Sequence, residues 1–155
     1  MAQIPTDLYR SMMGNTIKKI TDGINPGDAV LDPRWEESSR TLATGEVRID
    51  QADVDYGPGR NGPEVQPGGG TSLHDVRKWY HAADFWIPKG TEYSDEIKLT
   101  KSKYPSTSRS TKVTGTHYQL EVRTAMTRET FAGYLKNLVR AAVAKQVELA
   151  KIGAK

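Results

Sequence analysis

The 155-residue chain contains no cysteine. Disulfide bonds, thiolate nucleophiles and cysteine zinc sites are therefore excluded, and a reducing compartment is compatible with the sequence. No apolar run reaches membrane length, and the first residues lack the basic and apolar segments of a secretory signal. We therefore expect neither a membrane contact nor a signal peptide. The formal net charge of +3 gives no case for nucleic-acid binding from total charge alone.

Several common catalytic motifs are also missing. The sequence has no Gly-x-Ser-x-Gly elbow, no P-loop and no Gly-x-Gly-x-x-Gly dinucleotide fingerprint. Of the three histidines, His74 and His81 are seven residues apart on an expected helix, which is too far to share a metal ion, so no metal site is predicted. The length fits one domain over residues 1–155, and three tryptophans and seven tyrosines supply large side chains for its core.

The most distinctive stretch is Gly-Gly-Gly-Thr-Ser at residues 68–72. Three glycines allow a ligand or another strand to approach the backbone closely. Apolar residues recur at helical spacing over 73–80, and Asp75 follows Ser72 by three residues, much as in a capping box, so a helix is predicted to begin at Ser72. A glycine turn that leads into a helix start suits a phosphate group. A flexible turn with an ordinary N-cap is the alternative.

The remaining patterns predict a mixed α+β chain. Strands are expected at residues 46–49, 85–87, 97–99 and 116–122, with a strand or turn at 8–10; residues 88–91 suit a turn. Residues 11–24 have a weak helical pattern, 25–45 are expected to be irregular, and 56–70 form a long glycine-rich loop. A long amphipathic helix is predicted over about residues 128–151, with Thr127 as its N-cap and Gly153 as its stop.

The strand predicted at residues 116–122 alternates clearly. Its apolar side chains should face the core and its polar side chains a solvent or ligand face: Tyr118, Leu120 and Val122 against His117, Gln119 and Glu121. The segment before it, residues 100–115, contains no acid and is expected to be a basic loop. With Lys98 just before it, its cations are Lys101, Lys103, Arg109 and Lys112, which are either solvated or in contact with substrate phosphates or an acidic partner.

Several blocks together resemble the family of type VI secretion effector toxins that have an ADP-ribosyltransferase fold. Gly-Arg-Asn-Gly at 59–62 is followed after six residues by Gly-Gly-Thr-Ser at 69–72. Ile-Pro-Lys-Gly-Thr occupies 87–91, and Thr-His-Tyr at 116–118 is followed by Leu120 and Met126. Leu-Tyr-Arg at 8–10 and the amphipathic helix near residue 128 also match, and the likeness is continuous from about residue 57 onward.

This resemblance implies a single compact α+β domain in which a split, strongly bent antiparallel sheet holds NAD in a cleft, with a long C-terminal helix. It implies an NAD-dependent mono-ADP-ribosyltransferase that arrests growth from the cytoplasm of a target bacterium and is neutralised in its producer by a cognate immunity protein. We expect that protein to be acidic, because it should meet the basic region or the mouth of the cleft. The acceptor, a macromolecule or a metabolite, is not readable from the chain.

The resemblance also nominates site residues. Arg10 matches the arginine that contacts the dinucleotide, Thr71 and Ser72 match the hydroxyl motif of the nicotinamide pocket, and His117 is the family's match on the late strand. The family pattern does not fix an acid at Glu121, the candidate for the glutamate that grips the nicotinamide ribose.

Elementary chemistry supports the same set of residues. Cleavage of the glycosidic bond of NAD develops positive charge on the ribose, which a carboxylate or dipole from Glu121 or Gln119 would stabilise. Arg10 or Arg60 would supply a cation for the pyrophosphate, beside Gly70 and the amides of the expected helix start.

Structural roles remain open for the same residues. Arg10 would then be a surface arginine, Arg60 would fix its own loop, and Ser72 would only cap a helix. His117 would be a structural hydrogen-bonding group and Glu121 a solvent-facing acid. Three other functions also remain: an NAD glycohydrolase, a non-catalytic toxin that binds an essential macromolecule through its basic loop, and an antitoxin-like structural domain.

Overall fold

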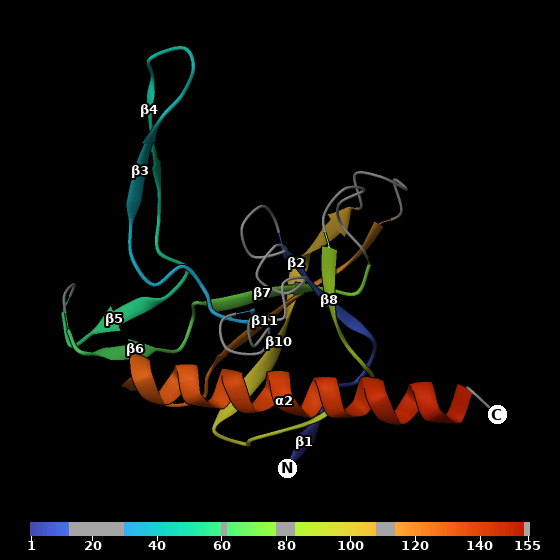
Figure 1. Ribbon diagram of the computed structural model, residues 1–155. Coiled ribbons are helices and arrows are strands. Elements are labelled where there is room, and N and C mark those ends of the chain that lie inside the picture. Colours follow the sequence, from blue (N-terminus) through green and yellow to red (C-terminus); the bar gives the residue numbers. More distant parts are fainter. Residues whose placement is uncertain (13–29, 60–61, 77–82, 108–113, 154–155) are drawn as a thin grey trace.

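The computed structural model describes residues 1–12, 30–59, 62–76, 83–107 and 114–153. Its centre is an antiparallel sheet in the spatial order β10-β11-β7-β2-β8 (Figure 1). The five strands are β10 (Ile97–Thr107), β11 (Thr114–Val122), β7 (Gly70–His74), β2 (Leu8–Met12) and β8 (Ala83–Ile87). The glycine-rich stretch thus supplies the middle strand, which is paired on both sides.

Three smaller antiparallel sheets accompany the central one. They are the three-stranded sheet β12 (Met126–Thr127), β6 (Glu64–Gln66) and β5 (Asp55–Gly57), the pair β1 (Ala2–Gln3) with β9 (Glu92–Tyr93), and the hairpin β3 (Ser38–Thr41) with β4 (Val47–Asp50). The helix α2 (Arg128–Gly153) follows β12 directly and runs along one side of the molecule (Figure 1). This arrangement confirms the expected single compact α+β domain with a long C-terminal helix.

The helix α2 closes the hydrophobic core. Thr127 is its N-cap, because the Thr130 backbone N–H donates to the Thr127 hydroxyl at 3.2 Å. The side chains on its inner face are buried at helical spacing: Phe131, Leu135, Leu138, Val139 and Ala142. The predicted stripe is wrong at its far end, since Val143 and Val147 are 39% and 50% exposed. No helix within the described residues is both long and apolar enough to cross a membrane.

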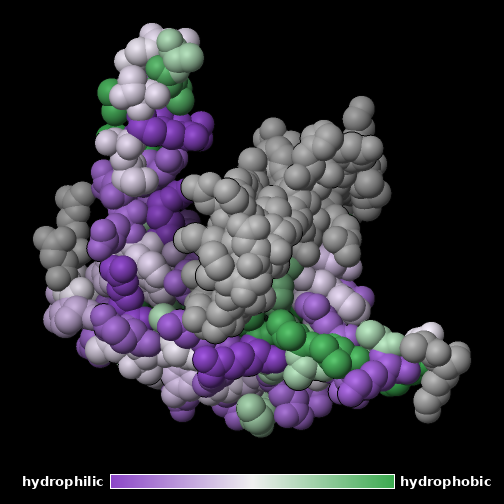
Figure 2. Space-filling view, viewed as in Figure 1, coloured by the Kyte–Doolittle hydropathy of each residue, from purple (hydrophilic) through white to green (hydrophobic). Residues whose placement is uncertain are grey.

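The hairpin of β3 and β4 projects from the body of the domain (Figure 1). The predicted strand at 46–49 is therefore present, as β4, but its expected half-burial is wrong: Val47 and Ile49 are 62% and 55% exposed. Figure 2 shows apolar side chains along this projection. Its base is closed by backbone hydrogen bonding, with the Asp53 N–H donating to the Arg34 carbonyl at 2.8 Å.

The helix predicted to start at Ser72 is wrong, because residues 70–74 form β7. Gly70 explains why: a Cβ there would lie 1.9 Å from the Leu120 carbonyl oxygen, so only glycine lets β7 approach β11. Pairing with β11 and β2 gives this segment backbone partners that a local capping pattern cannot supply, and tertiary context overrides propensity. Residues 77–82, the rest of the expected helix, lie outside the described residues.

Other segments differ from expectation in detail. β3 lies within the stretch expected to be irregular, β5 overlaps the start of the expected loop at 56–70, and β6 lies inside that loop. All described residues of the expected basic loop at 100–115 are strand, since β10 runs to Thr107, β11 begins at Thr114, and residues 108–113 lie outside the described residues. The expected turn at 88–91 is confirmed by the Thr91 N–H donating to the Pro88 carbonyl at 3.1 Å. The weak helical pattern at 11–24 falls almost wholly outside the described residues.

Candidate functional site

The central sheet has one core face and one polar face. Strand alternation places Leu120 and Val122 in the core, where both are fully buried, and turns the residues between them to the other side. Register then assembles side chains from neighbouring strands in rows. Gln119 lies opposite Ser72 on β7 and Thr100 on β10, and Glu121 lies opposite Gly70 and Lys98. We call this surface the polar face; it holds Lys98, Thr100, Ser72, Gln119 and Glu121.

Glu121 is the most enclosed acid of the polar face. Its side chain is only 7% exposed, and its Oε1 atom lies 3.1 Å from the Lys98 ammonium. The Thr100 hydroxyl donates to Oε2 at 3.0 Å, and the Gln119 amide donates to the same atom at 2.9 Å. Burial raises the pKa of Glu121, but the hydrogen bonds from Gln119, Lys98 and Thr100 outweigh it and hold the pKa below its ordinary value. The interpretation of Glu121 as a solvent-facing acid is therefore wrong.

Gln119 connects the acid to the glycine turn. Its amide nitrogen also donates to the Gly68 carbonyl at 3.2 Å, while the backbone of Gly68 has a φ of 118° that only glycine adopts readily. The turn before β7 and the Glu121 carboxylate are thus held by one side-chain amide. A carboxylate fixed by several donors suits recognition of a ribose hydroxyl or of developing positive charge.

An aromatic row lies beside these polar rows. Register aligns Trp86 with Tyr9, Tyr9 with His74, and His74 with His117, across β8, β2, β7 and β11. The rings of His74 and His117 have centroids 5.2 Å apart and are inclined at 42°. The buried indole N–H of Trp86 has no hydrogen-bond partner among the described residues. Flat rings in a row provide a surface on which a heteroaromatic base can stack.

This row could not be predicted from the sequence, because His74 was expected to lie on a helix. Its position on β7, one strand pairing away from β11, brings it to His117 instead. Lys98 and Thr100 were missed for a related reason. Lys98 was interpreted as a cation of a solvated loop or phosphate contact, whereas it lies on β10 and is paired with Glu121.

Arg10 and Thr71 point to the other side of the sheet. The Arg10 guanidinium donates to the Ser72 carbonyl at 3.0 Å and to the Asp32 carbonyl at 3.2 Å. The buried Thr71 hydroxyl donates to the Leu31 carbonyl at 2.6 Å. Burial lowers the pKa of Arg10, mainly by removing its charge from water. Together the two side chains attach the segment around Leu31 to the middle of the sheet, so Arg10 is not a surface arginine.

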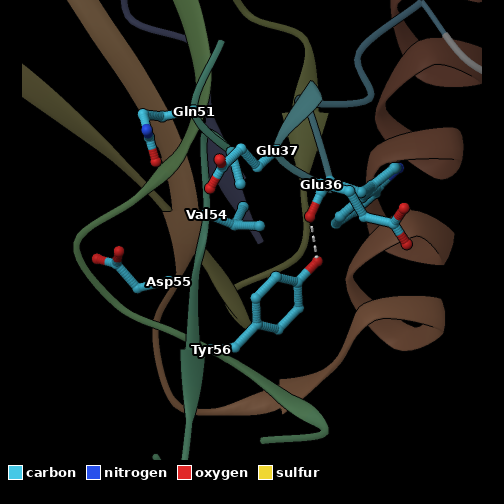
Figure 3. A pocket seen from close by; sticks show the side chains of 8 residues that line it. Glu36, Glu37, Gln51, Val54, Asp55 and Tyr56 are labelled. Carbon is cyan, nitrogen blue, oxygen red and sulfur yellow. Dashed lines mark hydrogen bonds between the residues drawn. The ribbon is translucent and has the colours of Figure 1, made fainter. Parts of the chain in front are cut away.

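A concavity lies away from the polar face, between the hairpin base and β5 (Figure 3). Its volume is about 480 Å³, and acids line much of it, with Glu36, Glu37 and Asp55 among the lining residues. The Tyr56 hydroxyl donates to the Trp35 carbonyl at 2.7 Å beside it (Figure 3). This acidic lining does not suit the pyrophosphate of a dinucleotide.

The structure therefore brings together four of the nominated residues and separates two others. His117, Gln119 and Glu121 lie on the same side of β11, as their spacing predicts, and Ser72 lies opposite Gln119 on β7 although it was expected at a helix start. Gly70 lies in the same row as Glu121 but serves the close approach of two strands. Thr71 and Arg10 have the contacts on the core side described above, and Arg60 lies outside the described residues.

Comparison with known proteins identifies the family. A family model described as Tse2 ADP-ribosyltransferase toxin matches residues 6–147. Toxin Tse2 of Pseudomonas aeruginosa is 34% identical over 95 residues, which cover 60% of this chain and 57% of that relative. The family match includes every strand from β2 to β12, and hence the whole polar face. The chain belongs to the Tse2 ADP-ribosyltransferase toxin family.

Proposed function

We propose that this chain is an NAD-dependent mono-ADP-ribosyltransferase whose site is the polar face of the central sheet. The observation that carries the proposal is a pair of adjacent cross-strand rows, one with Ser72 opposite Gln119 and the next with Glu121, in a member of this toxin family. Bound NAD would supply the ADP-ribosyl group, with its nicotinamide as the leaving group. The remaining roles in the reaction would belong to the side chains of the polar face and to the acceptor.

The donors and acceptors present fit such a substrate. Glu121 presents an ionised carboxylate held in a fixed orientation, which would stabilise positive charge developing on the ribose. Ser72 adds a hydroxyl in the adjacent row, and Gln119 retains its amide oxygen as an acceptor, since its nitrogen is already engaged. The unpartnered Trp86 N–H in the aromatic row is a donor that a carboxamide or phosphate oxygen would satisfy.

The core-side contacts give Arg10 and Thr71 indirect roles in this proposal. Arg10 holds the Ser72 carbonyl, and Thr71 holds the segment of Leu31, so both fix the position of β7. The position of β7 in turn sets the distance between Ser72 and the residues of β11. His117 remains the nominated residue at the aromatic end of the polar face, with Arg60 as a further candidate for the pyrophosphate.

Nicotinamide release from NAD by the purified protein tests the proposal. Label transfer from NAD carrying a tagged adenosine to lysate components distinguishes a transferase from an NAD glycohydrolase, which would release nicotinamide without labelling any acceptor. Glu121→Gln should abolish both activities while leaving the circular dichroism spectrum unchanged. Growth arrest that persists without nicotinamide release, and equally in Glu121→Gln, would instead indicate a non-catalytic toxin that binds an essential macromolecule.

The biological setting follows from the family and is part of the proposal. We infer an antibacterial toxin, delivered by a type VI secretion machine, that acts in the cytoplasm of the target cell. A cognate immunity protein, expected to be acidic, would cover the polar face or the basic region at 98–112. Because Lys98 is already neutralised by Glu121, Lys101, which is exposed on the same strand, is the better-placed cation of the two. Co-expression of the immunity protein should restore growth, and charge reversal at Lys101 should weaken the complex.

A further inference from the structure

Two residues of β10 contact the Glu121 carboxylate. Lys98 lies directly opposite Glu121 in the β10–β11 register, and Thr100 lies opposite Gln119. Resting on the function proposed above, we propose that Lys98 and Thr100 are positioning residues, which orient the Glu121 carboxylate for the reaction without contacting the substrate. Neither residue belongs to the motifs that led to the family.

The contacts divide the two carboxylate oxygens between different donors. Lys98 Nζ lies 3.1 Å from Oε1, whereas the Thr100 hydroxyl and the Gln119 amide approach Oε2 at 3.0 and 2.9 Å. Rotation of the carboxylate would break contacts at both oxygens at once. Because both oxygens have donors, these contacts fix the orientation of the Glu121 carboxylate as well as its negative charge.

The surroundings of Glu121 are asymmetric. On the β10 side stand a cation and a hydroxyl, while on the β7 side the opposite residue is Gly70, which has no side chain. The groups that face Glu121 are therefore Lys98 and Thr100 from β10, Gln119 from its own strand, and the Gly68–Gly70 turn through Gln119. Because β7 offers no side-chain donor in this row, the orientation of the acid depends on β10.

The donors to Glu121 also preserve its negative charge, which matters because its side chain is only 7% exposed. A buried carboxylate without donors takes up a proton or moves toward water, and either change removes the negative charge that the proposed reaction needs. The Lys98 side chain is itself 34% exposed, so its ammonium group keeps partial hydration while it holds the acid in its ionised form. Substituting Lys98 or Thr100 should therefore impair the chemical step more than the binding of substrate.

The test uses Lys98→Met and Thr100→Val, which remove a donor while keeping most of the side-chain volume. Lys101→Met is the matched control, because Lys101 is on the same strand, carries the same charge and is exposed on the opposite face. We expect kcat for nicotinamide release to fall about tenfold in each test variant, which corresponds to about 1.4 kcal/mol, with KM changed less than about twofold. The acidic limb of the pH–rate profile should move to higher pH, and Lys98→Arg and Thr100→Ser should restore much of the rate.

A second measurement does not need catalysis. Titration of the glutamate side-chain carbons by 13C NMR, with Glu121→Gln to assign the resonance, should show a higher pKa for Glu121 in both test variants than in Lys101→Met. An unchanged pKa, or a rate loss no greater than in the control, would overturn the positioning role. If the wild-type protein releases no nicotinamide, the proposed function fails, and the titration alone then decides whether β10 controls the carboxylate.

Discussion

Substitutions at Thr71 and its neighbour Ser72 distinguish a structural role from a role in the proposed reaction. Its hydroxyl donates to the Leu31 carbonyl at 2.6 Å, and Thr71 and Leu31 are 0% and 1% exposed. Thr71→Val keeps the shape of the side chain and removes only the donor. The Leu31 carbonyl is then buried without this partner, which costs about 1–3 kcal/mol of unfolding free energy. With a urea m-value of about 2 kcal/mol/M, a loss of 2 kcal/mol lowers the midpoint of unfolding by about 1 M.

Urea unfolding followed by tryptophan fluorescence measures this shift, and two further variants complete the comparison. Thr71→Ser keeps the hydroxyl and should recover most of the loss. Ser72→Ala changes the neighbouring side chain, which is half-buried on the polar face, and should lower the free energy of unfolding by less than about 1 kcal/mol while abolishing nicotinamide release. A Thr71→Val midpoint equal to that of the wild type, or a Ser72→Ala protein as destabilised as Thr71→Val, would refute this division of roles.

Three other perturbations have defined outcomes. The pKa of Glu121 is lowered in the folded protein. The stability that Glu121 contributes is therefore present above the unfolded-state pKa of about 4.3 and is lost as the pH falls through the folded-state pKa. Below about pH 5, the urea midpoint should fall less steeply in Glu121→Gln than in the wild type. Gly70→Ala places a Cβ 1.9 Å from the Leu120 carbonyl oxygen, and should cost about 1–3 kcal/mol or prevent folding, as judged by soluble yield and thermal melting. Replacement of residues 38–50 by a short Gly-Ser linker should change the free energy of unfolding by less than about 1 kcal/mol, because this hairpin projects from the body and its apolar side chains are exposed.

Local sequence patterns predicted those elements whose own side chains decide their structure. The long C-terminal helix and the strand at 116–122 were predicted because their apolar residues recur at periods that only one structure satisfies. The side chains of His117, Gln119 and Glu121 could be assigned to one face for the same reason. Alternation along a strand is a local property, and it holds whatever the strand pairs with.

The middle strand could not be predicted in this way. Residues 70–74 have the local pattern of a helix start, and they form a strand because β11 and β2 are available on either side. The Lys98–Glu121 pair likewise depends on register, which no local pattern contains. Arg10 was expected to contact a ligand, yet its guanidinium donates to the backbone carbonyls of Ser72 and Asp32, because the chain after residue 30 passes over the core side of β7.

The glycine and hydroxyl motif acquires a physical explanation once it is placed on a strand. Gly70 is needed where two backbones meet, Thr71 points to the core side and anchors a distant segment, and Ser72 points to the polar face in the row of Gln119. On a helix start, the two hydroxyls would have shared one anion-binding role. On a strand, adjacent residues face opposite ways, so one motif both fixes the sheet and furnishes the site. A substitution at Thr71 should therefore reach the proposed chemistry only through the stability and position of β7, whereas one at Ser72 should reach it directly.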